Sequence, residues 1–155
     1  MDDKWDRRFM AMSFLVASWS KDPSTQCGSV IVDTNKRIVS VGFNGFPKGT
    51  SDEETLYNNR EEKYEKILHA ETNSILFAQR DLTGYTMYVV PLPPCSRCMS
   101  LIIQSGIKRV VSIQPSDDLK KRWWGSNLLS FSMAKQAGID ITLYSDVDIE
   151  TKNKV

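Results

Sequence analysis

The sequence predicts an α/β fold, a three-layer α/β/α sandwich in which helices cover both faces of a mixed central sheet of about five strands. Two observations lead to this prediction. Short runs rich in β-branched residues alternate with longer stretches in which apolar residues recur every three or four positions. The chain has 155 residues, 41% of them hydrophobic, which suits one domain over residues 1–155 with a core of its own.

The first part of the chain predicts a helix followed by two strands. Apolar residues follow helical spacing over residues 5–19, and the segment 21–24, Lys-Asp-Pro-Ser, ends this helix. Residues 28–32 and 38–43 are rich in strand-forming residues and are joined by a polar turn. We expect these two strands to form a hairpin.

The rest of the chain predicts a long loop and then alternating helices and strands. Residues 44–59 are rich in Gly, Pro and polar residues, so we expect a loop there and a place for function. Helical spacing returns over residues 60–80. The last elements are a strand over 86–90, a helix over 95–105 that Gly106 stops, a strand over 108–113, a helix over 128–136 that Gly138 stops, and a strand over 141–144.

The net charge and the distribution of apolar residues disfavour long nucleic acids and membranes as partners. There are 20 Lys and Arg residues against 19 Asp and Glu, so the formal net charge of +1 gives no electrostatic footprint for long nucleic acids. The apolar stretch near the N-terminus is too short and interrupted for a membrane span or a signal peptide. We therefore expect a cytoplasmic protein, in the host cytoplasm if it is viral. The polar tail from about residue 146 is expected to be mobile.

The strongest chemical signal joins the only histidine to two cysteines. His69 stands two positions before Glu71, and Cys95 and Cys98 follow Pro94 in a Pro-Cys-x-x-Cys sequence. This pattern is typical of zinc deaminases, in which one His and two Cys bind the metal and the Glu is not a ligand. In a reducing compartment, metal binding also explains an odd number of cysteines better than a disulfide framework does.

The spacing of these residues suits a catalytic zinc site. If helices begin just before His69 and near Cys95, the ligands lie in first turns, where the helix dipoles favour thiolate over thiol. Three protein ligands leave the fourth tetrahedral position for water, whose pKa falls toward about 7 on zinc. We expect Glu71 to take the water proton, to deliver it to the ring nitrogen beside the reacting carbon, and to protonate the departing ammonia.

Plainer interpretations compete with a catalytic site. A lone His is commonly a packed or capping residue, and a lone Cys-x-x-Cys is often redox-active or structural. A closed structural zinc site would need a fourth ligand, and Cys27 is the only other cysteine. Cys27 sits amid a strand run and is expected to be a small core residue.

Several segments beyond the zinc motif resemble the deoxycytidylate deaminase family. They are Ser20–Gln26, Gly42–Pro47, His69-Ala70-Glu71-x-Asn73 and Leu101–Lys108, and the likeness extends from Trp5 to about Tyr144. The resemblance implies the cytidine deaminase type of sandwich and one catalytic Zn²⁺ per subunit, since the extra ligands of a second zinc are missing. It also implies hydrolysis of dCMP to dUMP and ammonia, which supplies dUMP for dTTP synthesis.

The same resemblance assigns substrate contacts. Asn44 would hydrogen-bond the deoxyribose, and the loop of residues 21–26 would border the phosphate; an Asx-Pro turn and an ordinary loop start are the plainer interpretations. The segment 120–124 departs from the family, which usually carries a Tyr nearby. A Trp there could stack on cytosine and an Arg could bind phosphate, or the segment could be a basic turn with two core tryptophans. The residues expected to bind substrate are Lys21, Ser24, Thr25, Asn44, Ala70, Arg122, Trp123 and Trp124.

By the same resemblance the protein would be a homohexamer that dCTP activates and dTTP inhibits, with Mg²⁺ accompanying the effector triphosphate. Effector or interface contacts are expected in the loop after the second strand and at the far end of the segment 60–80, although a Phe on a helix face is often a core residue. The five positions are Gly45, Phe46, Lys48, Phe77 and Arg80.

Other functions stay open from the sequence. The enzyme could also accept dCTP. A deaminase of tRNA or single-stranded DNA is disfavoured by the near-zero net charge, and a nucleoside deaminase by the ligand His. A zinc-stabilised binding domain without catalysis would be free to lose Glu71, so the presence of Glu71 favours an enzyme.

Overall fold

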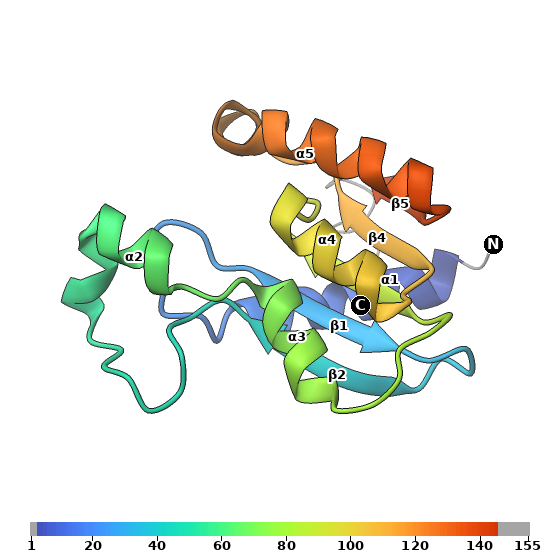
Figure 1. Cartoon of the computed structure of the whole chain (residues 1–155), viewed down its shortest axis with the longest axis horizontal. Coiled ribbons are helices and arrows are strands. Elements are labelled where there is room, and N and C mark those ends of the chain that lie inside the picture. Colours follow the sequence, from blue (N-terminus) through green and yellow to red (C-terminus); the bar gives the residue numbers. More distant parts are fainter. Residues whose placement is uncertain (1–2, 146–155) are drawn as a thin grey trace.

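A computed structural model describes residues 3–145 and shows alternating helices and strands (Figure 1). The polar tail expected from residue 146 lies outside the described residues. The elements are α1 (Asp3–Ala17), β1 (Gly28–Val32), β2 (Ile38–Phe43), the 3-10 helix η1 (Glu54–Asn58), α2 (Arg60–Lys66), α3 (Ala70–Ala78), β3 (Thr86–Val90), α4 (Ser96–Ser105), β4 (Arg109–Ile113), α5 (Asp117–Ala137) and β5 (Asp140–Tyr144).

The five strands form one mixed sheet in the order β2-β1-β3-β4-β5. The strand β1 runs antiparallel to both of its neighbours, so that Gly28 lies opposite Phe43 on one side and Val90 on the other. The strands β3, β4 and β5 are parallel, and α4 and α5 connect them. The predicted hairpin and the mixed five-stranded sheet are therefore confirmed.

Helices cover both faces of this sheet, as the three-layer prediction requires. Alternate strand residues point to opposite faces, so Val30 and Val32 pack in one core with α1, whereas Ile31 packs in a second core with α4 and α5. Figure 1 shows α3, α4 and α5 side by side on the face opposite α1. The site described below lies on the side of these three helices.

Two glycines allow helices to approach the hairpin closely. A Cβ atom on Gly28 would lie 2.1 Å from the carbonyl oxygen of Ser13 in α1. A Cβ atom on Gly42 would lie 2.5 Å from the carbonyl oxygen of Ala70 and 2.5 Å from the amide nitrogen of Ser74, both in α3. Since no side chain fits in either gap, the backbone of the hairpin packs directly against the helices on its two faces.

The helical spacing over residues 60–80 does not form one helix, because the backbone of Leu68 pairs with another segment. The amide of Leu68 donates to the carbonyl of Gly45 at 2.8 Å, and the amide of Gly45 donates back at 3.0 Å. This bridge separates α2 from α3 and leaves His69 at the start of α3. The predicted loop of residues 44–59 is present, but it also contains η1.

The last helix is longer than the sequence predicts. It begins at Asp117 and not at residue 128, because the hydroxyl of Ser116 accepts a hydrogen bond from the amide of Leu119 and caps it. Gly106 and Gly138 end α4 and α5 in the left-handed conformation, with φ of 87° and 76°, which confirms both predicted stops. No helix within residues 3–145 is long and apolar enough to span a bilayer.

Candidate metal centre and active site

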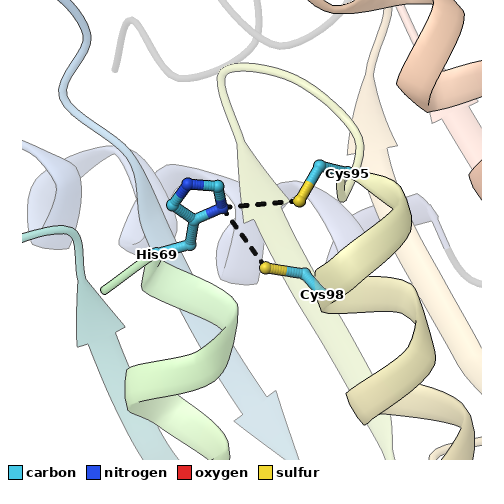
Figure 2. Close-up of side chains that lie close together, drawn as sticks. All are labelled: His69, Cys95 and Cys98. Carbon is cyan, nitrogen blue, oxygen red and sulfur yellow. Dashed lines mark hydrogen bonds between the residues drawn. The ribbon is translucent and has the colours of Figure 1, made fainter. Parts of the chain in front are cut away.

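Two helix N-termini bring the three predicted metal ligands together (Figure 2). His69 is the residue immediately before α3, and Cys95 has the same place before α4. Cys98 lies in the first turn of α4. The partial positive charge of both helix N-termini is therefore directed at this cluster, where it stabilises thiolates.

The distances in this cluster fit a tetrahedral metal. The Nδ1 atom of His69 lies 3.4 Å from the Sγ atom of Cys95 and 3.4 Å from that of Cys98. Two ligands on tetrahedral zinc, at about 2.0 Å for nitrogen and about 2.3 Å for sulfur, are separated by about 3.6 Å. The three ligand atoms all lie within 4.8 Å of one another. A His-Cys-Cys donor set of this size fits Zn²⁺.

The contact between the two sulfur atoms favours the loss of one thiol proton from the pair. A hydrogen bond with Cys98 lowers the pKa of Cys95 to about 4, and a hydrogen bond with His69 adds to this effect. The contact with Cys95, together with burial, raises the pKa of Cys98. The hydrogen bond to Cys95 also raises the pKa of His69. One thiolate thus forms readily, and a divalent cation would compensate the charge of a second.

Glu71 lies beside the cluster in the first turn of α3. Its side chain is buried and lines the same cavity as His69 and Cys95. Burial raises the pKa of this carboxyl group, because desolvation penalises the charged form. A buried carboxyl group with a raised pKa next to a metal site can take up and release protons, as a general base and acid must.

Most of the residues expected to contact substrate line this cavity. Ser24 and Thr25 come from the loop after α1, Asn44 follows β2, and Arg122 and Trp123 belong to α5. The guanidinium group of Arg122 donates to the hydroxyl of Thr25 at 2.6 Å, which joins two elements far apart in the sequence. The structure therefore brings five predicted substrate residues together with the cluster.

The two tryptophans of α5 have different surroundings. The ring of Trp123 lies edge-on to the ring of His69, with centroids 6.1 Å apart, and lines the cavity. The ring of Trp124 packs against Phe131, and the ammonium group of Lys120 lies over it. Only Trp123 of this pair lies on the cavity wall. Both residues are helical, so the segment 120–124 is not a turn.

Lys21 and Ala70 lie elsewhere. The ammonium group of Lys21 is exposed and donates to Asp52 at 2.6 Å, and Lys21 is not among the residues that line the cavity. Ala70 is fully buried, and its carbonyl faces the backbone of Gly42. Neither Lys21 nor Ala70 therefore lies among the residues that line the cavity with the metal cluster, and their substrate contacts stay predictions.

The five positions expected to bind effectors divide into separate contacts. Gly45 pairs with Leu68 in the bridge described above, and Phe46 stacks on Tyr57 with centroids 4.4 Å apart. The ammonium group of Lys48 lies 5.9 Å from the ring centroid of Phe77, which is exposed on α3 and not in the core. Arg80 lies over the ring of Tyr85 and donates to its hydroxyl group.

The structure also shows cavity residues that the sequence did not reveal. Asp22 and Lys63 line the cavity as a buried ion pair, and Tyr64, the next residue in the sequence after Lys63, lines it too. Cys27 was expected in the core, but it is half-buried and lines the cavity, because it precedes β1 instead of lying within it. In the sequence, Lys63 is one of several charged residues on a short polar helix, so no pattern marks it out.

Two residues of α5 that the sequence did not mark out, and that do not line the cavity, hold the loop before Cys95. The side-chain amide of Asn127, fully buried on α5, donates to the carbonyls of Pro93 at 3.0 Å and Pro94 at 3.3 Å. The neighbouring hydroxyl of Ser126 accepts from the amide of Ser96 at 2.9 Å. The helix α5 thus fixes the start of α4, although it carries no metal ligand.

Comparison with known protein families shows which family this chain belongs to. A family model described as the cytidine and deoxycytidylate deaminase zinc-binding region matches residues 3–114, which include the cluster and Glu71. The chain belongs to this family. It is 50% identical over 142 residues to an uncharacterized deaminase of Aliivibrio fischeri, covering 92% of this chain and 95% of that protein. It is 46% identical over 114 residues to mouse deoxycytidylate deaminase, covering 70% of this chain and 64% of the mouse protein.

Solved structures share the cytidine deaminase fold. The dCMP deaminase of cyanophage S-TIM5 in its apo form superposes with a TM-score of 0.70 at 23% identity, covering 92% of this chain and 99% of that one. A bifunctional deaminase and reductase of Thermotoga maritima gives a TM-score of 0.63 at 25% identity, covering 97% of this chain and 39% of that one. The family's sandwich with a zinc-binding deaminase site is therefore the architecture of this chain.

Proposed function

We propose that this deaminase hydrolyses dCMP to dUMP and ammonia. One observation carries the proposal: a buried carboxyl group, Glu71, shares a cavity with the His69-Cys95-Cys98 cluster, and the polar wall of that cavity suits a nucleotide. The relatives support the choice of substrate. Mouse and human proteins 46% and 44% identical to this chain are named deoxycytidylate deaminases.

The reaction requires an activated water and a group that moves protons. His69, Cys95 and Cys98 would hold a zinc ion, which would supply the Lewis acidity that lowers the pKa of water. Glu71 accepts the proton that the water loses, because burial has raised the pKa of its carboxyl group. Glu71 passes this proton to the ring nitrogen next to the amino-bearing carbon. It then accepts the proton of the hydroxyl group that has been added to that carbon and passes it to the leaving amine, so that ammonia departs, the carbonyl group forms and Glu71 returns to its starting charge.

The cavity wall suggests how the nucleotide lies. The edge of the cytosine that carries the amino group points toward Glu71, and the ring of Trp123 forms a wall for the base. Asn44 contacts the sugar. Arg122, which is anchored on the hydroxyl of Thr25, provides the cation for the phosphate at the rim.

The decisive test measures ammonia release from zinc-loaded protein supplied with dCMP, dCTP or deoxycytidine. We expect dCMP to be the best substrate and Glu71→Gln to lower kcat by about three orders of magnitude while zinc content stays unchanged. Glu65→Gln, an exposed carboxylate on α2, is the matched control and should retain full activity. Zinc-bound protein that turns over none of the three compounds contradicts the proposal.

The finer parts of the proposal concern regulation and assembly: activation by dCTP, inhibition by dTTP, Mg²⁺ with the effector, and a homohexamer. One arrangement supports a contact with an effector or another subunit at this place. Phe77 is exposed on α3 and in contact with Lys48 from the loop after β2, which places an apolar and a cationic group together on the surface. Repeating the assay with dCTP and dTTP, and measuring the mass in solution against six times 17.6 kDa, tests these parts.

A further inference from the structure

The buried ion pair between Lys63 and Asp22 has no role in the chemistry described so far. Lys63 is the buried residue of α2, a short helix otherwise made of exposed and half-exposed side chains. Its ammonium group lies 2.8 Å from Oδ1 of Asp22, and the two side chains are only 8% and 4% exposed. A buried charge is stable only when it is compensated, so each of the two groups depends on the other.

The carboxylate of Asp22 also holds groups that face the substrate cavity. Its Oδ1 atom accepts a second hydrogen bond, from the amide of Ser24 at 2.8 Å. Its Oδ2 atom accepts a hydrogen bond from the side-chain amide of Asn44 at 3.2 Å. The hydroxyl of Ser20 accepts from the amide of Asp22 and donates to the carbonyl of Asn44, which draws the two backbones together.

These contacts fix which end of the Asn44 amide is available to a ligand. Both hydrogens of Nδ2 are used, one by Asp22 and the other by the carbonyl of Thr25 at 2.9 Å. The Oδ1 atom accepts one hydrogen bond, from the amide of Cys27 at 2.8 Å, and an amide oxygen can accept two. Asn44 lines the cavity, so what it offers there is an acceptor.

An acceptor in this place selects a ligand that donates. The deoxyribose of a 5′-monophosphate has one free hydroxyl group, on C3′. We propose that Asp22 and Lys63 are positioning residues that lock Asn44 so that its Oδ1 atom accepts a hydrogen bond from the 3′-hydroxyl of the substrate. Lys63 acts through Asp22, and Asp22 acts through Asn44. The inference rests on the proposed function, because it needs a nucleotide in the cavity.

The variant Asp22→Asn tests this chain of contacts without a change in volume. The ammonium group of Lys63 and the backbone amide of Ser24 both donate hydrogen bonds to position 22. In the variant the oxygen of the new side chain must therefore face these two donors, and its NH₂ group takes the place of Oδ2. That NH₂ group then opposes Nδ2 of Asn44, and two donors face each other. The Asn44 amide loses one of its three hydrogen bonds, and the contact between two donors pushes it away from the position in which Thr25 and Cys27 would otherwise hold it.

The measurement compares kcat/KM for dCMP, for its 3′-deoxy analogue 2′,3′-dideoxycytidine monophosphate, and for deoxycytidine. We expect wild-type protein to prefer dCMP over the 3′-deoxy analogue by about tenfold or more, the value of one well-placed hydrogen bond. In Asp22→Asn and in Lys63→Met this preference should fall to about twofold or less, because kcat/KM falls for dCMP and for deoxycytidine, which both carry the 3′-hydroxyl, and not for the 3′-deoxy analogue. Lys63→Arg, which keeps the charge, should restore most of it. The preference for dCMP over deoxycytidine should stay unchanged throughout.

Matched controls separate positioning from folding. Lys66→Met removes an exposed lysine that pairs with Glu62 on the same helix, and Asp140→Asn alters an exposed carboxylate on β5; neither should change the preference for the 3′-hydroxyl. Equal losses on dCMP and on the 3′-deoxy analogue would overturn the inference, since a merely structural role affects both. So would a lost preference for the phosphate, which would place Lys63 directly on that group. Wild-type protein that does not deaminate dCMP overturns the proposed function and the inference together.

Discussion

Trp123 and Trp124 are neighbours in the sequence, but their side chains make different contacts from α5. Trp123 lines the cavity beside His69, whereas Trp124 packs against Phe131. We expect Trp123→Ala to raise the KM for dCMP about tenfold with little change in the free energy of unfolding, because stacking on a base contributes about 1–3 kcal/mol. Trp124→Ala should instead lower the free energy of unfolding by about 2 kcal/mol and leave KM nearly unchanged.

Steady-state kinetics and urea unfolding of the two variants check this division. A reversed pattern, with KM raised only in Trp124→Ala, would show that the other ring contacts the base.

Single residues also show where sequence reasoning succeeds. The positions of His69, Glu71, Cys95 and Cys98 could be predicted because metal chemistry requires these residue types at short, fixed spacings, and the structure brings all four together. Lys63 could not be predicted in this way. Lys63 is buried because the chain folds back onto the hairpin after a long loop. No local pattern in the sequence predicts how that loop folds.

At the scale of elements, the helix α3 depends on its contact with β2. A Cβ atom on Gly42 would meet backbone atoms at the start of α3, which cannot move aside as a flexible side chain can. We expect Gly42→Ala to lower the free energy of unfolding by about 2 kcal/mol and to weaken zinc binding, because His69 moves with the start of the helix.

Gly125→Ala is the matched control for this prediction. Gly125 is exposed within α5, and no atom lies within 4 Å of the position that its Cβ would take. Alanine there should raise the free energy of unfolding by about 1 kcal/mol, since glycine is a poor helix former. Zinc competition titrations and urea unfolding measure both effects. Unchanged zinc affinity in Gly42→Ala would contradict a coupling between this contact and the metal site.

Element boundaries were predicted where a local signal sets them. Gly106 and Gly138 end their helices as expected, because the left-handed conformation at a helix end favours glycine. The break between α2 and α3 and the early start of α5 were missed. The break depends on pairing between Leu68 and Gly45, which are distant in sequence. The start of α5 is an exception, since Ser116 is a local cap signal, but the segment that follows it is basic and was interpreted as a possible turn.

At the scale of the whole molecule, Asp6 ties α1 to three strands. Its buried carboxylate accepts hydrogen bonds from Tyr88 of β3 at 2.8 Å, from Arg109 of β4 at 2.7 Å and 2.8 Å, and from Tyr144 of β5 at 2.6 Å. The layers of the sandwich could be predicted from the order of helices and strands. This tie could not, because its members are up to 138 positions apart.

Stability should therefore depend on pH through Asp6. Burial alone would raise the pKa of its carboxyl group, but the hydrogen bonds from Arg109, Tyr144 and Tyr88 outweigh burial and hold the pKa below its ordinary value of 3.8. The stabilisation is complete above the pKa of the unfolded chain and is lost as the pH falls through the lower pKa of the folded protein. Asp6→Asn should lower the free energy of unfolding by about 3 kcal/mol at pH 7.

Urea unfolding of both metal-free proteins from pH 7 down to pH 3 measures this dependence. The difference between wild type and Asp6→Asn should start to shrink below about pH 5, as the wild-type carboxyl group becomes protonated in the unfolded chain. A difference that stays constant over this range would mean that the charge of Asp6 is not what stabilises the sheet.

His69 is the only histidine in the sequence, which has a practical consequence for NMR spectroscopy. The chain contains one histidine, and its Nδ1 atom faces both sulfurs of the cluster. Protein labelled with ¹⁵N only in histidine would therefore give one pair of imidazole nitrogen resonances, without overlap and without an assignment problem. A titration with zinc would shift the Nδ1 signal directly, so that metal occupancy could be followed residue-specifically while nucleotides are added.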